Sequence, residues 1–186
     1  MKNKLVIFIM VNMLAITAFA KEQISRTYLG YTLGVTTANE MFRNSPKSEG
    51  FTFTEALNLS SSQLVFSGDF IVDGMHMHTM SAEFVNDTLY KLEFKETSLN
   101  IDNSSLYEKF LIEEKAKYAK FTSLDTSAFV KDIPADSLNW VHRTDGITEI
   151  WIAVKKNMIT YKVEDERLKD VYFAKMAEEL SSAFNK

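Results

Sequence analysis

The sequence contains no cysteine, which rules out disulfide bonds, thiolate metal ligands and a cysteine nucleophile. The lipidated cysteine that a bacterial lipoprotein needs is missing as well. Proline is scarce, with only Pro46 and Pro134, and no low-complexity linker divides the chain. We therefore expect one continuous domain that depends on its hydrophobic core for stability.

Clusters of lysine or arginine are also lacking. The formal net charge of the 186-residue chain is −4 at pH 7. A surface of this sign is a poor match for nucleic acid or for an anionic membrane. We therefore expect neither of them as a partner.

No apolar run is long enough to cross a bilayer, because the longest, 5–16, falls short of the roughly 20 residues that a membrane helix needs. This run follows Lys2 and Lys4 and leads into an A-x-A motif at 18–20. The arrangement is typical of a secretory signal peptide, and the alternative is an uncleaved N-terminal anchor.

We predict a signal peptide over 1–20 that is cleaved after Ala20. The mature chain, 21–186, then forms a single domain with no stable membrane insertion. Its formal charge is −6, because the leader removes two lysines and no acidic residue. The lysine- and asparagine-rich, proline-poor composition is typical of bacteria, so we expect a periplasmic or secreted protein.

Signatures of common active sites are absent: there is no glycine-rich phosphate loop, no G-x-S-x-G elbow and no H-E-x-x-H motif. His142 and Asp145 lie beside a predicted turn and offer acid–base chemistry if a substrate pocket is present. A solvated hairpin end is the simpler interpretation of this pair. We predict that the protein is not an enzyme.

Helix signals are present at two capping boxes. Thr37 with Glu40, and Ser105 with Glu108, predict that helices begin at these positions. Apolar residues spaced three and four apart extend the second helix to about residue 121.

A third helix is predicted over 171–184 by the same periodicity. Its apolar face is expected to carry Val171, Ala174, Leu180 and Phe184, with Met176 or Ala177 near it. This face should pack on the rest of the domain.

Strand signals are clearest in a hairpin. Apolar residues alternate at 80–84 and again at 90–94, with Asn86 and Asp87 as turn residues between them. Even-numbered side chains should face the core. The segment 147–154 is apolar on nearly both faces, which predicts a central strand.

Together these elements predict an α+β fold with an antiparallel sheet and helices packed on one face. The chain reads as two helix-plus-strand-meander halves, about 28–98 and 99–186. Each half has an aspartate-glycine pair before a long strand, at 73–74 and at 145–146.

A family resemblance follows from helix starts and hairpins along the chain. The segments that carry it are 33–36, 83–87, 89–92, 106–109, 117–120, 140 and 159–161. In them the chain resembles small exported bacterial proteins with a tandem α+β layout, such as the β-lactamase-inhibitor-like fold and the half-size BamE-like outer-membrane assembly subunit. The resemblance covers most of 30–165 and implies the same fold and, for some members, binding to other proteins. It implies no functional residue here.

The stretch GMHMHTM at 74–80 holds two of the three histidines. On a regular strand, His76, His78 and Met80 point to the same side. Two imidazoles and a thioether suit copper, and imidazoles suit zinc. The other interpretation places both histidines at the rim of the sheet, bonded to polar neighbours, with no cofactor.

Trp151 alternates with Ile150 and Ile152, so it should lie on the opposite face of the sheet from them. An exposed tryptophan on a sheet face is a typical anchor for a protein partner. We therefore predict a non-catalytic protein that binds a partner in the bacterial envelope through an open sheet face. The alternative function is a periplasmic copper- or zinc-binding protein.

Overall fold

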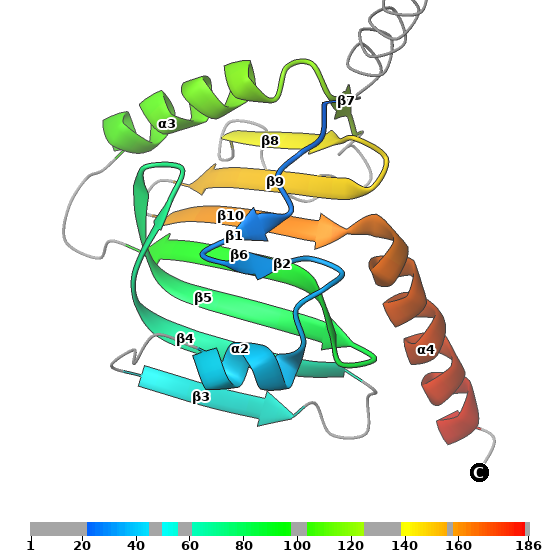
Figure 1. Cartoon of the computed structure of the whole chain (residues 1–186). Coiled ribbons are helices and arrows are strands. Elements are labelled where there is room, and N and C mark those ends of the chain that lie inside the picture. The colour runs from blue at the N-terminus through cyan, green and yellow to red at the C-terminus, as the bar shows by residue number, and fades with distance from the viewer. Residues whose placement is uncertain are drawn as a thin grey trace, which may run out of the picture.

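The computed structural model describes residues 22–44, 50–55, 61–97, 104–124, 139–155 and 158–184. The predicted signal peptide over 1–20 and the segment 125–138 lie outside the described residues. Within the described ranges, three helices and ten strands form an α+β fold in which most strands join one antiparallel sheet (Figure 1). The predicted α+β class with an antiparallel sheet is confirmed.

The main sheet has eight antiparallel strands in the order β3-β4-β5-β6-β10-β9-β8-β7. Their bounds are β3 (Gly50–Glu55), β4 (Ser61–Val72), β5 (Met75–Val85), β6 (Thr88–Thr97), β7 (Thr122–Ser123), β8 (Asn139–Thr144), β9 (Thr148–Lys155) and β10 (Met158–Asp165). Neighbours in the sheet are consecutive in sequence except where β6 pairs with β10. The predicted central strand is β9, which lies between β10 and β8.

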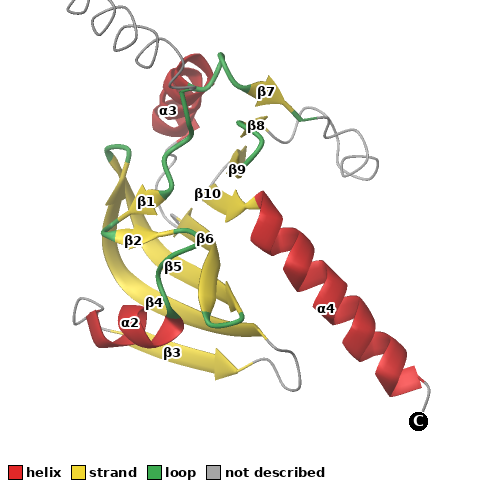
Figure 2. Cartoon of the chain, turned by 45° about the vertical axis from the view of Figure 1, so that its right-hand side comes forward, coloured by secondary structure: helices red, strands yellow, loops and turns green. Residues whose placement is uncertain are grey.

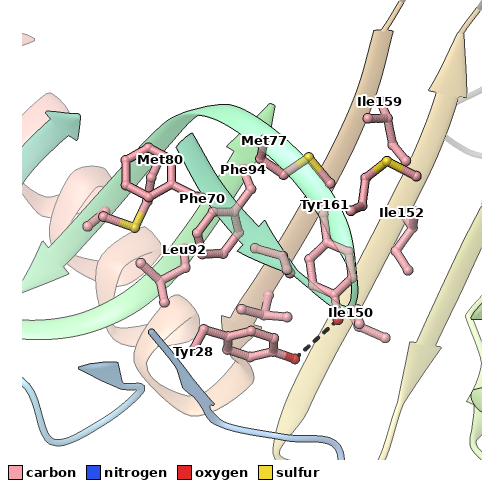
Figure 3. Close-up of a cluster of buried hydrophobic side chains, with 14 of the residues drawn as sticks. Tyr28, Phe70, Met77, Met80, Leu92, Phe94, Ile150, Ile152, Ile159 and Tyr161 are labelled. Carbon is pink, nitrogen blue, oxygen red and sulfur yellow. Dashed lines mark hydrogen bonds between the residues drawn. The ribbon is translucent and has the colours of Figure 1, made fainter. Parts of the chain in front are cut away.

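One row of directly paired residues crosses five strands and forms the middle of the core. It runs from Phe66 to Met80, Phe94, Tyr161 and Ile152, all of which are fully buried. Figure 3 shows four of these side chains packed together. Because strand side chains alternate, this row defines one side of the sheet. We call this side the core face and the opposite side the outer face.

Three elements cover the core face: a small sheet of β1 (Thr27–Tyr28) and β2 (Tyr31–Thr32), helix α2 (Ala38–Asn44) and helix α3 (Ser104–Lys117) (Figures 1 and 2). Helix α2 contacts β4, and α3 contacts β8 and β9. The buried residues of α3 are Tyr107, Phe110, Leu111 and Glu114.

Two local predictions are confirmed. The Thr37 hydroxyl accepts from the Glu40 backbone N–H at 3.1 Å, and the Glu40 carboxylate accepts from the Thr37 N–H at 3.5 Å, so this capping box starts α2. Asn86 and Asp87 both have positive φ, 52° and 58°, which closes the β5–β6 hairpin with the twist that its strands favour. In contrast, α3 begins at Ser104, so the expected cap residue Ser105 already lies inside the helix.

Helix α4 (Glu166–Phe184) lies on the outer face, so the expectation that all helices pack on one face is wrong. Figure 2 shows α4 and α2 on opposite sides of the sheet. The Lys169 ammonium binds Glu149, whose neighbour Ile150 points into the core.

The reason lies at the junction of β10 and α4. The Asp165 carboxylate, at the end of β10, accepts from the backbone N–H groups of Arg167 and Leu168 at 3.0 and 3.2 Å. This cap starts the helix directly at the strand end, without a loop to lead it back over the core. The core face there is already occupied by the N-terminal segment, whose Arg26 pairs with Asp165.

The tip of the β4–β5 hairpin curls over the core face (Figure 1). The strand pairing shifts between Ser67 and Phe70, where β4 has one residue more than β5. Such a bulge bends and twists the hairpin. As a result Asp73, at the tip, accepts a hydrogen bond of 2.6 Å from the Tyr161 hydroxyl on β10.

Among the described helices, none combines the length and the apolar character needed to cross a membrane.

Candidate functional site

Trp151 lies on the outer face of the sheet, as its alternation with the buried Ile150 and Ile152 predicts. Its neighbours across the strands are His142 on β8 and Lys162 on β10. The Lys162 ammonium lies 5.0 Å from the centre of the indole ring, within cation–π range. The tryptophan is half-buried rather than fully open.

Beside Trp151, a network of ion pairs connects the sheet to α4. Glu149 Oε1 lies 2.6 Å from His142 Nε2, and Glu149 Oε2 lies 2.7 Å from Lys169 Nζ. Lys169 also reaches Glu164 at 3.0 Å. His142 is therefore a buried member of this network, with a side chain only 11% exposed, and not a solvated hairpin end.

Electrostatics hold the Glu149–Lys169 pair in its ionised form. Burial by itself raises the pKa of Glu149, but the hydrogen bonds from His142 and Lys169 outweigh it and lower the pKa to about 2. Burial likewise lowers the pKa of Lys169, and its bonds to Glu149 and Glu164 raise it further than burial lowers it. The charged pair is thus the stable form over the whole physiological pH range.

Farther along, α4 is held by aromatic and polar contacts. The Tyr172 ring stacks on Tyr90 of β6, with centroids 5.1 Å apart and planes at 21°. Tyr90 donates a hydrogen bond of 2.6 Å to Glu83, and burial together with this bond raises the pKa of Tyr90. Lys175 binds the side chain of Asn86 at the β5–β6 turn.

The rest of α4 presents apolar side chains to solvent. Of residues 166–183, none is buried. Val171 is 37% exposed, Phe173 50% and Leu180 51%. Phe173 and Leu180 are two turns apart, so they lie on one side of the helix. We call Phe173 and Leu180 the α4 apolar patch; Val171 lies on the opposite side of the helix from them.

The predicted packing face of this helix is wrong. Val171, Ala174 and Leu180 are exposed, whereas Leu168 and Tyr172 are among the residues turned toward the sheet. The predicted face was chosen because its apolar residues have helical spacing. The side of α4 that faces the sheet is instead attached through Lys169 and Tyr172, and a hydrophobic pattern does not reveal such contacts.

The structure separates the three predicted metal ligands. Met80 is fully buried between Phe66 and Phe94. His76 and His78 point outward, with side chains 63% and 65% exposed. The three therefore differ in burial, and the buried set on β5 shifts from Met75 and Met77 to Met80 opposite the bulge in β4.

Each of the two histidines pairs with its own carboxylate. His76 Nδ1 lies 2.8 Å from Asp69, and His78 Nδ1 binds Glu96. The hydrogen bond to Glu96 is the main cause that raises the pKa of His78. No group of three or more histidine or acidic side chains suited to a metal ion occurs among the residues that the structure describes.

The residues of the outer-face network were not predicted as a group. The sequence singles out Trp151 and His142, but it does not connect them with Glu149, Lys169 or Tyr172. The available signal was weak: Glu149 interrupts an apolar run at 147–154, and a charge inside such a run must find a partner. The identity of that partner depends on where α4 lies.

The chain has no significant match to a protein-family model, to a curated protein or to a solved structure.

Proposed function

We propose that this protein is an exported, non-catalytic binding protein that contacts a protein partner of the bacterial envelope through its outer face. One observation carries the proposal. Helix α4 buries none of its residues over 166–183, yet it holds the α4 apolar patch in solvent at a fixed position. Exposed apolar surface beside a polar rim is characteristic of protein interaction sites.

The polar contacts of α4 support this reading. Lys169 and Tyr172 attach one side of the helix to the sheet through an ion pair and a ring stack. Helices in proteins gain most of their stability from tertiary contacts, so these contacts help to keep the 19-residue helix folded and in place. The apolar patch is thereby presented in a preformed arrangement, which lowers the entropic cost of binding a partner.

Trp151 extends the same surface across the sheet. It is half-buried on the outer face, and Lys162 lies over its ring. Tryptophan residues with one accessible face are frequent anchors in interfaces. We assign Trp151 a contributing role and the α4 apolar patch the central one.

The envelope location rests on the predicted leader over 1–20. We also infer that the chain is assembled as two helix-plus-meander halves, about 28–98 and 99–186. In support, β3–β6 and β8–β10 are each consecutive neighbours in the sheet, and among the described strands the two sets pair with each other through β6 and β10. The signal peptide is tested by the N-terminal sequence of the purified envelope protein, which should begin at Lys21.

Site-specific photo-crosslinking in the producing bacterium tests the proposed interface. A p-benzoylphenylalanine residue is placed at Phe173 in one strain and at Ile112 in a control strain. Ile112 is 67% exposed on α3, which covers the core face. We expect a discrete adduct with one envelope protein from position 173 and none from position 112. The absence of an adduct from 173, or the same adducts from both positions, contradicts the proposal.

A further inference from the structure

A cavity of about 420 Å³ opens where three segments meet on the core side of the molecule. They are the N-terminal segment 22–29, the β4–β5 hairpin tip at 71–73, and the end of α3 with the turn that follows it, 117–121. A volume of this size is typical of sites that bind small molecules. The cavity is on the opposite side of the sheet from the α4 apolar patch, so the two sites are independent.

Three tyrosines bring their hydroxyl groups together beside this cavity, with Tyr161 fully buried and outside its lining. The Tyr161 oxygen lies 3.0 Å from the Tyr118 oxygen. It also lies 3.4 Å from the Tyr28 oxygen, the contact that is dashed in Figure 3. Tyr161 donates its own proton to Asp73 Oδ2 at 2.6 Å. Tyr28 and Tyr118 are both in the cavity wall.

The direction of these hydrogen bonds follows from a count of protons. A tyrosine hydroxyl has one proton, and that of Tyr161 goes to Asp73. The Tyr161 oxygen therefore accepts from both Tyr28 and Tyr118. These two hydroxyls have no proton left to donate, but each keeps lone pairs. Toward a ligand they act only as acceptors.

The charged groups beside them also have more acceptors than donors. Lys117 Nζ lies 2.7 Å from Asp73 and 3.5 Å from Glu114, so one ammonium serves two carboxyl groups. Glu114 Oε2 is buried and has no hydrogen-bond partner. Burial, with a contribution from the negative charge of Asp73, raises the pKa of Glu114 to about 7. Asp73 and Glu114 thus share the one ammonium of Lys117, while Lys120 pairs with Glu22.

The cavity wall already accommodates ammonium groups on its aromatic rings. Lys117 Nζ lies 4.9 Å from the centre of the Tyr118 ring, and Lys120 Nζ lies 5.3 Å from that of Phe121. Both distances are within the range of cation–π attraction. Ile71 and Val72 add apolar surface for a hydrocarbon stem.

We propose that this cavity binds a small primary amine in its ammonium form. The ammonium has three N–H donors, and Asp73 with the hydroxyl oxygens of Tyr28 and Tyr118 supplies three acceptors. Lys117 is an internal competitor, because its ammonium occupies part of this position in the ligand-free protein. Its side chain is 43% exposed, so it is free to move aside.

Isothermal titration of the purified protein with 3-methylbutylamine tests the proposal, with 3-methylbutan-1-ol as the uncharged control of the same shape. We expect saturable binding of the amine and at least about tenfold weaker binding of the alcohol, which lacks the charge-assisted bonds. Lys117→Met keeps the apolar stem but removes the competing ammonium, so it should strengthen amine binding about fivefold. Asp73→Asn should weaken it by about tenfold or more.

Two further variants keep the outcome clear. Asp73 also anchors the hairpin tip, so Tyr28→Phe provides a second loss of one acceptor, with an expected weakening of about threefold to tenfold. Glu113→Gln changes an exposed acidic residue of α3 and should have no effect. The proposal is overturned if neither the wild type nor Lys117→Met binds the amine saturably, if the alcohol binds equally well, or if Asp73→Asn and Tyr28→Phe both leave the affinity unchanged.

Discussion

The two faces of the sheet are built from the same strands but differ in what holds them to the rest of the molecule. On the core face, apolar residues such as Phe94 and Ile152 are fully buried under α2, α3 and the β1–β2 sheet. On the outer face, charged side chains pair across strands, as Lys91 does with Glu83 at 2.6 Å. Period-two alternation allows one sheet to be a hydrophobic layer on one side and an ion-paired surface on the other.

The two long helices show the same contrast. Helix α3 has a buried side that includes Tyr107 and Leu111, and it is part of the core. Helix α4 buries none of its residues over 166–183 and is attached by Lys169 and Tyr172. Helix α3 therefore contributes to stability through burial, whereas α4 is held by a few specific contacts and keeps its apolar side chains for another surface.

The largest expected effect is on the core face. Phe94→Ala should lower the free energy of unfolding by about 3–5 kcal/mol, because it leaves a cavity among fully buried residues. Trp151→Ala, the matched aromatic truncation on the outer face, should cost only about 1 kcal/mol, since the ring is half-buried. Urea unfolding followed by far-ultraviolet circular dichroism measures both. Equal losses would mean that the outer face is part of the core.

The next effect concerns the outer-face network. Glu149→Gln removes the charge between His142 and Lys169 and should lower the free energy of unfolding by about 2 kcal/mol at pH 7. The pKa of Glu149 is lowered to about 2 from an ordinary 4.5, so the folded state binds this proton less readily than the unfolded state.

The sign of the pH dependence follows from this difference. The stabilisation by Glu149 is fully present above about pH 5 and is lost as the pH falls from 4.5 toward 2. Wild type and Glu149→Gln should therefore converge in acid. Urea titrations of both proteins at pH 7, 4 and 2.5 provide the measurement, and a gap that stays constant over this range would show that Glu149 acts by shape alone.

A smaller effect of opposite sign is expected beside the tyrosine cluster. The pKa of Glu114 is raised to about 7, so the folded state favours the neutral acid, and stability declines as the pH rises from 4.5 to 7. Glu114→Gln mimics the neutral form. It should be more stable than the wild type by about 1–2 kcal/mol at pH 8 and equally stable near pH 4. Thermal unfolding of both proteins at pH 8 and pH 4 measures this difference in stability. Glu113→Gln, an exposed position on the same helix, is the control.

Local pattern was enough to predict the strands and their turn chemistry, because alternation and positive-φ residues act over a few positions. The β5–β6 hairpin with its Asn86-Asp87 turn follows directly from such signals. The exposed position of His76 and His78 could not be predicted from such local signals. A bulge in the partner strand between Ser67 and Phe70 changes which residues of β5 are buried.

The cavity was beyond sequence reasoning for a different reason. Tyr28 and Tyr161 are 133 positions apart, and their hydroxyls meet Asp73 only because the bent hairpin tip reaches across the sheet. Each residue alone fits an ordinary strand or turn position. The position of α4 was equally hidden, since it depends on the Asp165 cap and on contacts of Lys169 with distant strands.

The smallest effect should come from the α4 apolar patch. Leu180→Ser replaces a side chain that is 51% exposed, so the free energy of unfolding should change by less than about 0.5 kcal/mol. The same change at a buried leucine of α3, Leu111→Ser, should cost several-fold more, because it also buries an unpaired hydroxyl. If α4 exists to bind a partner, Leu180→Ser abolishes the crosslink from position 173 while leaving the unfolding curve in place. A large loss of stability from Leu180→Ser would instead show that the residue packs within its own chain, and the contrast between the two helices would fail.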